Sequence, residues 1–170
     1  MGRNIVPIPE RIERYFIRAD VLEETSVYFK QKGRIRHEAY VFWAGSVPNT
    51  IDAYITCCII PRVRTAPGRV FVGLEKLLEI NRELVKREIV LLCQLHTHPG
   101  DFGHSTGDER QAASYRLGFI SIVVPNYGRQ GLMSLKRCYV YEYIGNWSWR
   151  LMKNNEVAQR FIVEEAKLSI

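Results

Sequence analysis

The chain has 170 residues, of which 46% are hydrophobic and 25% are charged. This is the composition of a folded globular protein, and it excludes a disordered chain or a coiled coil. The length suits one domain, which we expect to span residues 1–170. No apolar run of about 18 residues occurs, so no membrane-spanning helix is expected. Charges return by Glu10 and Arg11, which leaves no room for a secretory signal and predicts a cytoplasmic protein.

The net charge of +6 comes from 24 Lys and Arg residues against 18 Asp and Glu residues, a balance that mildly favours acidic partners. The sequence has no zinc finger, RNA-recognition motif or basic heptad region, so nucleic acid is not an expected partner. The four cysteines lack the C-x-x-C spacing of redox and zinc motifs, and we expect reduced thiols. A thiolate zinc site or a cysteine nucleophile is the less favoured alternative. The four are Cys57, Cys58, Cys93 and Cys138.

Helical and strand patterns alternate along the first half of the chain. A rough helical period predicts a helix over about 18–32, and Gly33 is a natural stop. Strands are predicted over 39–44 and over 51–60. Between 72 and 87, leucines spaced among charged residues predict an amphipathic helix.

The run 89–95 is almost entirely apolar, which is typical of a strand covered on both faces by other layers. We therefore expect it to lie at the centre of a sheet. Further along, the patterns predict, in order, a short helix over 108–117, a strand over 119–124, a hairpin of strands 138–144 and 147–151 joined at Gly145-Asn146, and a final helix over 156–168.

Three tyrosines, Tyr139, Tyr141 and Tyr143, share one face of the first hairpin strand. We expect this aromatic stripe to pack under the final helix, with a partner-binding surface as the alternative. Together, the predicted elements indicate a helix-rich, mixed α/β fold in which helices cover a sheet.

Two histidines, His96 and His98, follow the predicted central strand within the sequence His-Thr-His-Pro. Residues two apart in a strand point to the same side, so both imidazoles can reach one point. Two neutral imidazoles suit zinc, and a downstream carboxylate can supply a third ligand while water takes the fourth position. Asp108 is the candidate, because glycines in the intervening loop permit the chain to fold back. Asp101 is the alternative carboxylate, although a turn residue is its favoured interpretation.

A water nucleophile that attacks an amide also needs a proton acceptor that later protonates the leaving amine. Glu38 can fill this role, since it is an acid flanked by apolar and aromatic residues at the start of strand 39–44. Ser105 offers a hydroxyl donor for the developing oxyanion. We expect His37 and His104 to be solvent-exposed or to lie just outside the metal ligands, with substrate contact as a further option for His104.

These residues together resemble the JAMM (JAB1/MPN/Mov34) metalloprotease motif, which runs Glu, then His-Ser/Thr-His-Pro, then Ser-x-x-Asp. Glu38 stands ahead of a strand that ends in Ala-Gly, His-Thr-His-Pro follows an apolar strand, and Ser105 precedes Asp108 by the family spacing. The resemblance covers about residues 35–128, which is most of the chain. The loop before Ser105 is one residue shorter than the commoner family spacing, so Thr106 is the alternative hydroxyl.

The resemblance implies a cytidine-deaminase-like α/β fold, the JAB1/MPN fold, with a mixed sheet flanked by helices. It implies zinc on His96, His98 and Asp108, with Glu38 as the general base and acid acting on zinc-bound water and Ser105 steadying the oxyanion. Members of this family commonly cleave peptide or isopeptide bonds after the C-terminal tail of ubiquitin or a ubiquitin-like protein. The compact chain is similar to bacterial members, some of which accompany ubiquitin-like conjugation systems, with E1- and E2-like proteins, in antiphage defence.

Two other functions remain open for the same chain. One is a zinc peptidase that trims a sulfur-carrier protein with a ubiquitin-like fold, or a short peptide. The other is a non-catalytic scaffold of the same fold, which the intact Glu38, His96, His98 and Asp108 argue against. A zinc nucleobase deaminase shares the general architecture, but it needs His-x-Glu and Pro-Cys-x-x-Cys, and neither element occurs.

Overall fold

The structure, a computed structural model, describes residues 8–63 and 72–165. Strands and helices alternate along most of these residues. Their order is β1 (Arg14–Arg18), α1 (Ala19–Arg34), β2 (Tyr40–Ser46), β3 (Asp52–Ile59), α2 (Leu74–Lys86), β4 (Val90–Thr97), α3 (Thr106–Arg110), β5 (Ile120–Val124), the 3-10 turn η1 (Asn126–Gly128), β6 (Tyr139–Gly145), β7 (Ser148–Leu151), α4 (Asn154–Arg160) and β8 (Phe161–Glu164).

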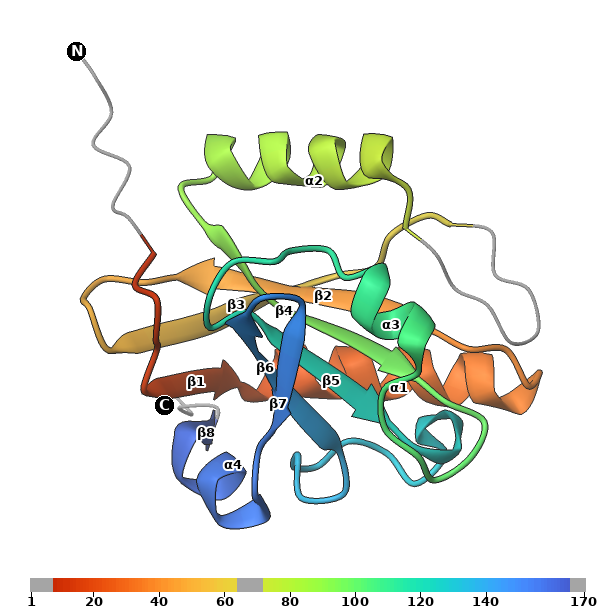
Figure 1. Ribbon diagram of the computed structural model, residues 1–170. Helices are drawn as coiled ribbons and strands as arrows, with labels where there is room; N and C mark the ends of the chain where they lie inside the picture. Colours follow the sequence, from red (N-terminus) through yellow and green to blue (C-terminus); the bar gives the residue numbers. More distant parts are fainter. Residues whose placement is uncertain (1–7, 64–71, 166–170) are drawn as a thin grey trace, which may run out of the picture.

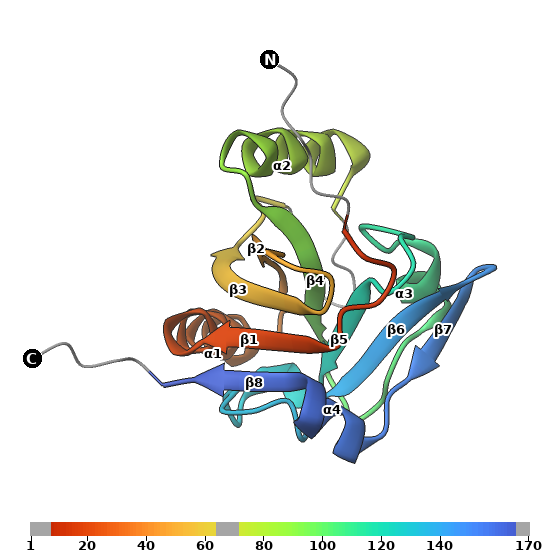
Figure 2. The same ribbon diagram turned by 90° about the vertical axis from the view of Figure 1, so that its left-hand side faces the viewer.

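The strands form one mixed sheet in the order β7-β6-β5-β4-β2-β3-β1-β8. β4 runs parallel to β5, and β1 runs parallel to both β3 and β8, while the other neighbours are antiparallel. The sheet is strongly curled, with α1 on one face and α2 on the other (Figures 1 and 2). The structure therefore confirms a mixed α/β fold with a sheet flanked by helices, and it confirms β4 as a central strand.

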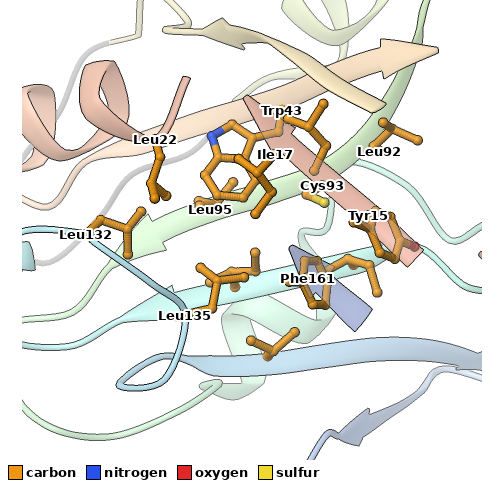
Figure 3. Packing of buried hydrophobic residues seen from close by; sticks show 14 of the residues in the cluster. Tyr15, Ile17, Leu22, Trp43, Leu92, Cys93, Leu95, Leu132, Leu135 and Phe161 are labelled. Carbon is orange, nitrogen blue, oxygen red and sulfur yellow. The ribbon is translucent and has the colours of Figure 1, made fainter. Parts of the chain in front are cut away.

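One hydrophobic cluster fills the space between the sheet and α1. Trp43 of β2 is fully buried there and packs with Leu22 of α1 and Leu95 of β4 (Figure 3). Fully burying one such aliphatic or aromatic side chain contributes about 1.5–3 kcal/mol relative to leaving it exposed. This cluster supports the back of β4 and so gives the candidate site a rigid base.

A second hydrophobic cluster lies on the opposite face, under α2. Successive residues of a strand point to opposite faces, so Tyr40 and Phe42 of β2 join this cluster together with Ile80 and Leu84 of α2. The face that carries Tyr40 is also the face on which His96 stands, since the Tyr40 and His96 rings stack at 5.8 Å.

The predicted final helix over 156–168 is wrong in its second half. α4 ends at Arg160, and the chain continues directly as β8, which pairs in parallel with β1. The β1 edge offers unpaired backbone groups, and Phe161 stacks on Tyr15 with the ring centroids 4.6 Å apart. These long-range contacts outweigh the local helical pattern. Residues 166–168 of that prediction lie outside the described residues.

The predicted helix over 108–117 is also too long, because α3 covers Thr106–Arg110 alone. Its start is set by Ser105, whose hydroxyl accepts a hydrogen bond from the Asp108 N–H at 3.2 Å. Its end is followed by a contact to the sheet, where the Ala113 N–H donates to the Gln94 side-chain oxygen at 2.7 Å. That N–H bonds to the sheet instead of to a preceding helical carbonyl, so the helix does not continue.

The β6–β7 hairpin is confirmed, but its turn is shifted by one residue. Gly145 pairs with Ser148, and the turn residues are Asn146 and Trp147, with φ of 50° and 56°. Positive φ at both central residues is the signature of a type I′ turn, whose twist matches that of the flanking strands. Asparagine tolerates this conformation well, which explains why it stands first in the turn.

The tyrosine stripe of β6 does not pack under the final helix. Tyr141 stacks against His104, and Tyr143 contacts Tyr115 and Trp149, so the stripe packs under the segment that carries α3. α4 lies against the other face of β6, where Glu142 forms an ion pair with Arg160. The alternation of side chains along β6 separates these two contacts.

The described residues contain no helix with both the length and the apolar character that a bilayer crossing needs. The cysteines, Cys57, Cys58, Cys93 and Cys138, are free, and Cys93 of β4 is the one that is fully buried.

Candidate active site

The end of β4 is held on both sides by its neighbours. On the β2 side, the Thr97 N–H donates to the Ala39 carbonyl at 3.0 Å. On the β5 side, the His98 N–H donates to the Val124 carbonyl at 3.0 Å. Beyond the strand, the Tyr127 N–H donates to the His98 carbonyl at 2.7 Å. Backbone hydrogen bonds therefore hold the chain in place around both histidines, independently of any contact that their side chains make.

The side chains of His96, His98 and Asp108 converge on one point. The Nε2 atoms of the two imidazoles are 3.1 Å apart. One carboxylate oxygen of Asp108 lies 3.1 Å from His96 Nε2, and the other lies 3.3 Å from His98 Nε2. Both histidines are buried, with relative exposures of 5% and 4%. The structure thus brings together the three residues that the sequence predicts as ligands.

These distances fit a metal ion. Ligand atoms about 2.0–2.1 Å from a tetrahedral zinc ion lie about 3.3 Å from one another. The 3.1 Å between the two Nε2 atoms is close to that value. Asp108 faces each imidazole with a different oxygen, and with one ligand atom taken from each residue the three atoms lie within 4.8 Å of one another. Two Nε2 atoms can share only one proton between them, whereas a cation at the centre would satisfy both nitrogens and the carboxylate. The donor set of two imidazoles and one carboxylate is that of a catalytic zinc site with an open position.

Asp108 reaches the histidines through the first turn of α3. Its carboxylate accepts a hydrogen bond from the Ser105 N–H at 2.6 Å, while its own N–H donates to Ser105 Oγ at 3.2 Å. This reciprocal capping box fixes the start of the helix. Gly103 in the preceding loop approaches the Tyr141 hydroxyl so closely that an added Cβ would lie 2.0 Å from it. The loop therefore requires a glycine there.

The remaining ring nitrogens differ in their surroundings. His98 Nδ1 lies 3.3 Å from the Phe102 carbonyl oxygen, which favours an Nδ1–H tautomer and leaves Nε2 free for the cluster. His96 Nδ1 is buried without a hydrogen-bond partner among the described residues. The stacked Tyr40 ring orients the His96 imidazole instead.

Within the cluster, Asp108 and His98 shift each other's pKa values toward the charged forms. Burial disfavours the charged form of Asp108, but hydrogen bonds from His96 and His98 hold the pKa of this carboxyl well below its ordinary range. Burial also opposes the charge of His98, yet the hydrogen bond and the charge of Asp108 raise the pKa of His98 overall. Protons thus bind where a dication would bind, and a metal ion would have to displace them.

Glu38 is half-buried and stands two residues before the start of β2. Burial raises its pKa, His98 and His96 oppose that rise, and Asp108 adds to it. Glu38 therefore lies within electrostatic range of all three converging side chains. A carboxylate with a raised pKa beside a polar cluster is a candidate for a group that accepts and returns a proton.

The other predicted candidates lie outside this cluster. Ser105 is exposed and caps α3, and Thr106 is exposed as the first residue of that helix. Asp101 is exposed, and its carboxylate accepts a hydrogen bond from the Tyr139 hydroxyl at 3.0 Å. It therefore does not take the place of Asp108.

His104 takes the second of the two positions expected for it, just outside the converging side chains, with its ring centroid 6.3 Å from that of His96. Its ring stacks on Tyr141 with the centroids 3.7 Å apart, and its Nε2 lies 2.8 Å from Ser121 Oγ. Burial, followed by the charge of His96, lowers the pKa of His104 to about 3. The sequence contains one sign of this contact, since Ser121 is the polar residue of an otherwise apolar β5 and Gln94 interrupts the apolar run that begins β4.

Comparisons with known proteins place the chain in a family. No family model matches it. Over 115 residues, it is 35% identical to the protein of Sinorhizobium fredii named "Probable metalloprotease y4jG", an alignment that covers 65% of this chain and 70% of that protein. The chain belongs to the same family as this relative.

A solved structure shares the fold of this chain. The solution structure of protein DSY2949 from Desulfitobacterium hafniense superposes with a TM-score of 0.65 at 14% identity, covering 89% of this chain and 94% of that one. At this identity the likeness concerns the fold alone.

Proposed function

We propose that the chain is a zinc-dependent metalloprotease of the JAMM type, which hydrolyses the bond after the C-terminal tail of a ubiquitin-like protein. The observation that carries this proposal is the convergence of His96, His98 and Asp108 at the end of β4, within electrostatic range of Glu38. The family relative named as a metalloprotease supports the general activity. The order of the motif residues along the chain supports the JAMM type.

Zinc is the metal that this donor set suits best. Two imidazoles and one carboxylate leave a fourth tetrahedral position open, which is the arrangement of catalytic rather than structural zinc sites. A zinc ion bound there would activate a water molecule as a nucleophile and polarise the carbonyl of the bond to be cleaved. His96, His98 and Asp108 are the proposed ligands.

Glu38 and Ser105 supply the remaining chemistry in this proposal. Glu38 takes the proton from the attacking water and returns it to the leaving amine, a task for which its raised pKa is suited. Ser105 Oγ accepts the Asp108 N–H through a lone pair, so its own O–H remains able to donate. That O–H is the proposed donor to the oxyanion of the tetrahedral intermediate.

The proposed substrates are ubiquitin-like proteins or their conjugates, and E1- and E2-like proteins of the same conjugation system are proposed partners. An antiphage role would follow from such a system. The resemblance of Glu38, His-Thr-His-Pro and Ser-x-x-Asp to the JAMM motif supports this assignment. A sulfur-carrier protein with a ubiquitin-like fold, or a short peptide, is the second candidate substrate, and a scaffold without catalysis is the third function to be tested.

The test uses three probes: ubiquitin fused through its C-terminal tail to a reporter domain, isopeptide-linked diubiquitin, and a sulfur-carrier fusion. We expect the zinc-loaded protein to cut a ubiquitin probe directly after the tail and a chelator to stop the reaction. Glu38→Gln should slow cleavage by about 10²–10⁴-fold, while Glu24→Gln, on the exposed side of α1, should not change it. Cleavage of the sulfur-carrier fusion alone would select the second substrate. Absence of both cleavage and bound zinc would favour the scaffold.

A further inference from the structure

β5 carries a small residue where its neighbours carry large ones. Ser121 pairs with Gln94 of β4 on one side and with Tyr141 of β6 on the other. Its side chain is fully buried, although it fills little of the space above the strand. A gap over β5 therefore opens between the side chains of the two flanking strands.

His104 fills this gap from the loop that precedes α3. Its ring lies nearly parallel to Tyr141, at 3.7 Å and 9°, and nearly parallel to His96, at 6.3 Å and 16°. The Trp149 ring meets it edge-on at 5.3 Å. A loop residue thus occupies a place in the sheet face that a β5 side chain would otherwise take, directly beside the proposed zinc ligand His96.

Hydrogen bonds anchor His104 and the chain around it. His104 Nε2 lies 2.8 Å from Ser121 Oγ, and the Gln94 side-chain N–H donates to the same oxygen at 3.0 Å. The His104 backbone N–H donates to the Tyr141 hydroxyl at 3.1 Å. The Gln94 oxygen in turn accepts the Ala113 N–H at 2.7 Å. Hydrogen bonds from the sheet therefore hold this segment at residue 104, before α3, and at residue 113, after it.

We propose that His104 is a positioning residue, which holds Ser105 and Asp108 in place for the metal centre through its contacts with Ser121 and Tyr141. α3 has 5 residues, and so short a helix has little stability of its own. Asp108 is also the one proposed ligand that does not belong to the end of β4. Its position depends on where the sheet holds the loop, and this inference rests on the metal centre proposed above.

The experiment compares His104→Ala, His104→Gln and Ser121→Ala with the wild type. Zinc affinity is measured by competition with a chromophoric chelator, and amide hydrogen exchange of residues 104–110 is measured in the metal-free protein. His104→Ala should weaken zinc binding by about 10- to 100-fold, the usual cost of losing a group that orients a ligand. The Ser105 and Glu109 amides should exchange faster. His104→Gln, which can still reach Ser121, should recover part of both effects, and Ser121→Ala provides a milder test of the same contact.

Leu132→Ala is the matched control, because Leu132 is buried in the cluster on the α1 face of the sheet. It should lower thermal stability without changing zinc affinity or exchange in residues 104–110. Zinc binding by His104→Ala and Ser121→Ala equal to that of the wild type, with unchanged exchange, would overturn the inference. Absence of zinc from the wild type would instead overturn the metal centre, while faster exchange in the metal-free His104→Ala would still support the positioning role.

Discussion

Ala39, the residue before β2, and Thr97, the last residue of β4, are joined by two hydrogen bonds. The Ala39 N–H donates to Thr97 Oγ1 at 2.9 Å, and the Thr97 N–H donates to the Ala39 carbonyl at 3.0 Å. Thr97 stands between the two histidines, and Ala39 follows Glu38 directly. The pair therefore fixes the base proposed for catalysis relative to the ligands proposed for zinc, through backbone contacts that need no metal.

Glu38→Gln should separate proton transfer from metal binding. Glu38 is not one of the three converging side chains, so the variant should bind zinc with the affinity of the wild type. Loss of the carboxylate base should lower kcat by about 10²–10⁴-fold. Zinc content by mass spectrometry and turnover of the ubiquitin fusion measure the two effects. Loss of zinc in this variant would mean that Glu38 is a ligand rather than a base.

Asp108→Ala should remove zinc from the protein. The wild type, purified without chelator, should hold about one zinc ion per chain, as expected for a site with three protein ligands. Without the carboxylate, His96 and His98 are left as two ligands, and zinc content should fall sharply. Asp101→Ala should keep its zinc, because the Asp101 carboxylate is bonded to Tyr139 outside the cluster. Equal zinc in both variants would contradict the ligand set.

Ser105→Ala tests the oxyanion donor. We expect kcat at saturating zinc to fall by about 10²-fold or more, the usual effect of removing one such donor. The variant also loses half of the α3 capping box, so its zinc affinity must be measured alongside turnover. Thr106→Ala should leave kcat unchanged. The reverse result, with Thr106→Ala impaired and Ser105→Ala active, would move the donor to Thr106.

The cluster of His96, His98 and Asp108 was predictable because its parts border strongly patterned elements. The apolar run of β4 identifies a central strand, and residues two apart at its end must face the same side. A glycine-rich loop then allows a carboxylate to return to that end. None of these steps depends on contacts between distant strands, so the local pattern was sufficient.

Other features depended on contacts that no local pattern contains. β8 forms because β1 offers an edge and Tyr15 offers a stacking partner for Phe161. α3 is short because the sheet takes the Ala113 N–H. His104 enters the sheet face because Ser121 leaves space there. In each case, a residue far away in the sequence decides the local structure, and tertiary packing overrides propensity.

The buried ion pair between Glu142 and Arg160 makes stability depend on pH. Glu142 Oε1 lies 2.9 Å from Arg160 Nη2, and the two residues are 6% and 5% exposed. Burial opposes the charge of Glu142, but hydrogen bonds from Arg160 and Arg150 bring its pKa below the ordinary value. A folded-state pKa below the unfolded one gives stability that is present above the unfolded pKa and is lost as the pH falls through the folded value.

Glu142→Gln should therefore lower the free energy of unfolding at pH 7 by about 1.5–3 kcal/mol, the usual contribution of a hydrogen bond to a charged group. The buried Arg160 loses its shortest carboxylate contact but keeps Glu156, 3.3 Å away, as a charged partner. The difference in free energy of unfolding between Glu142→Gln and the wild type should shrink as the pH falls below about 4.3, the ordinary pKa of glutamate. Protonation of Glu142 in the wild type then removes the charge that the variant already lacks. Urea unfolding of the chelator-treated proteins at several pH values measures this. Glu83→Gln is the control, since its pair with Lys86 is exposed and should contribute little. A constant difference between Glu142→Gln and the wild type from pH 7 down to pH 3 would contradict the role of the Glu142 charge.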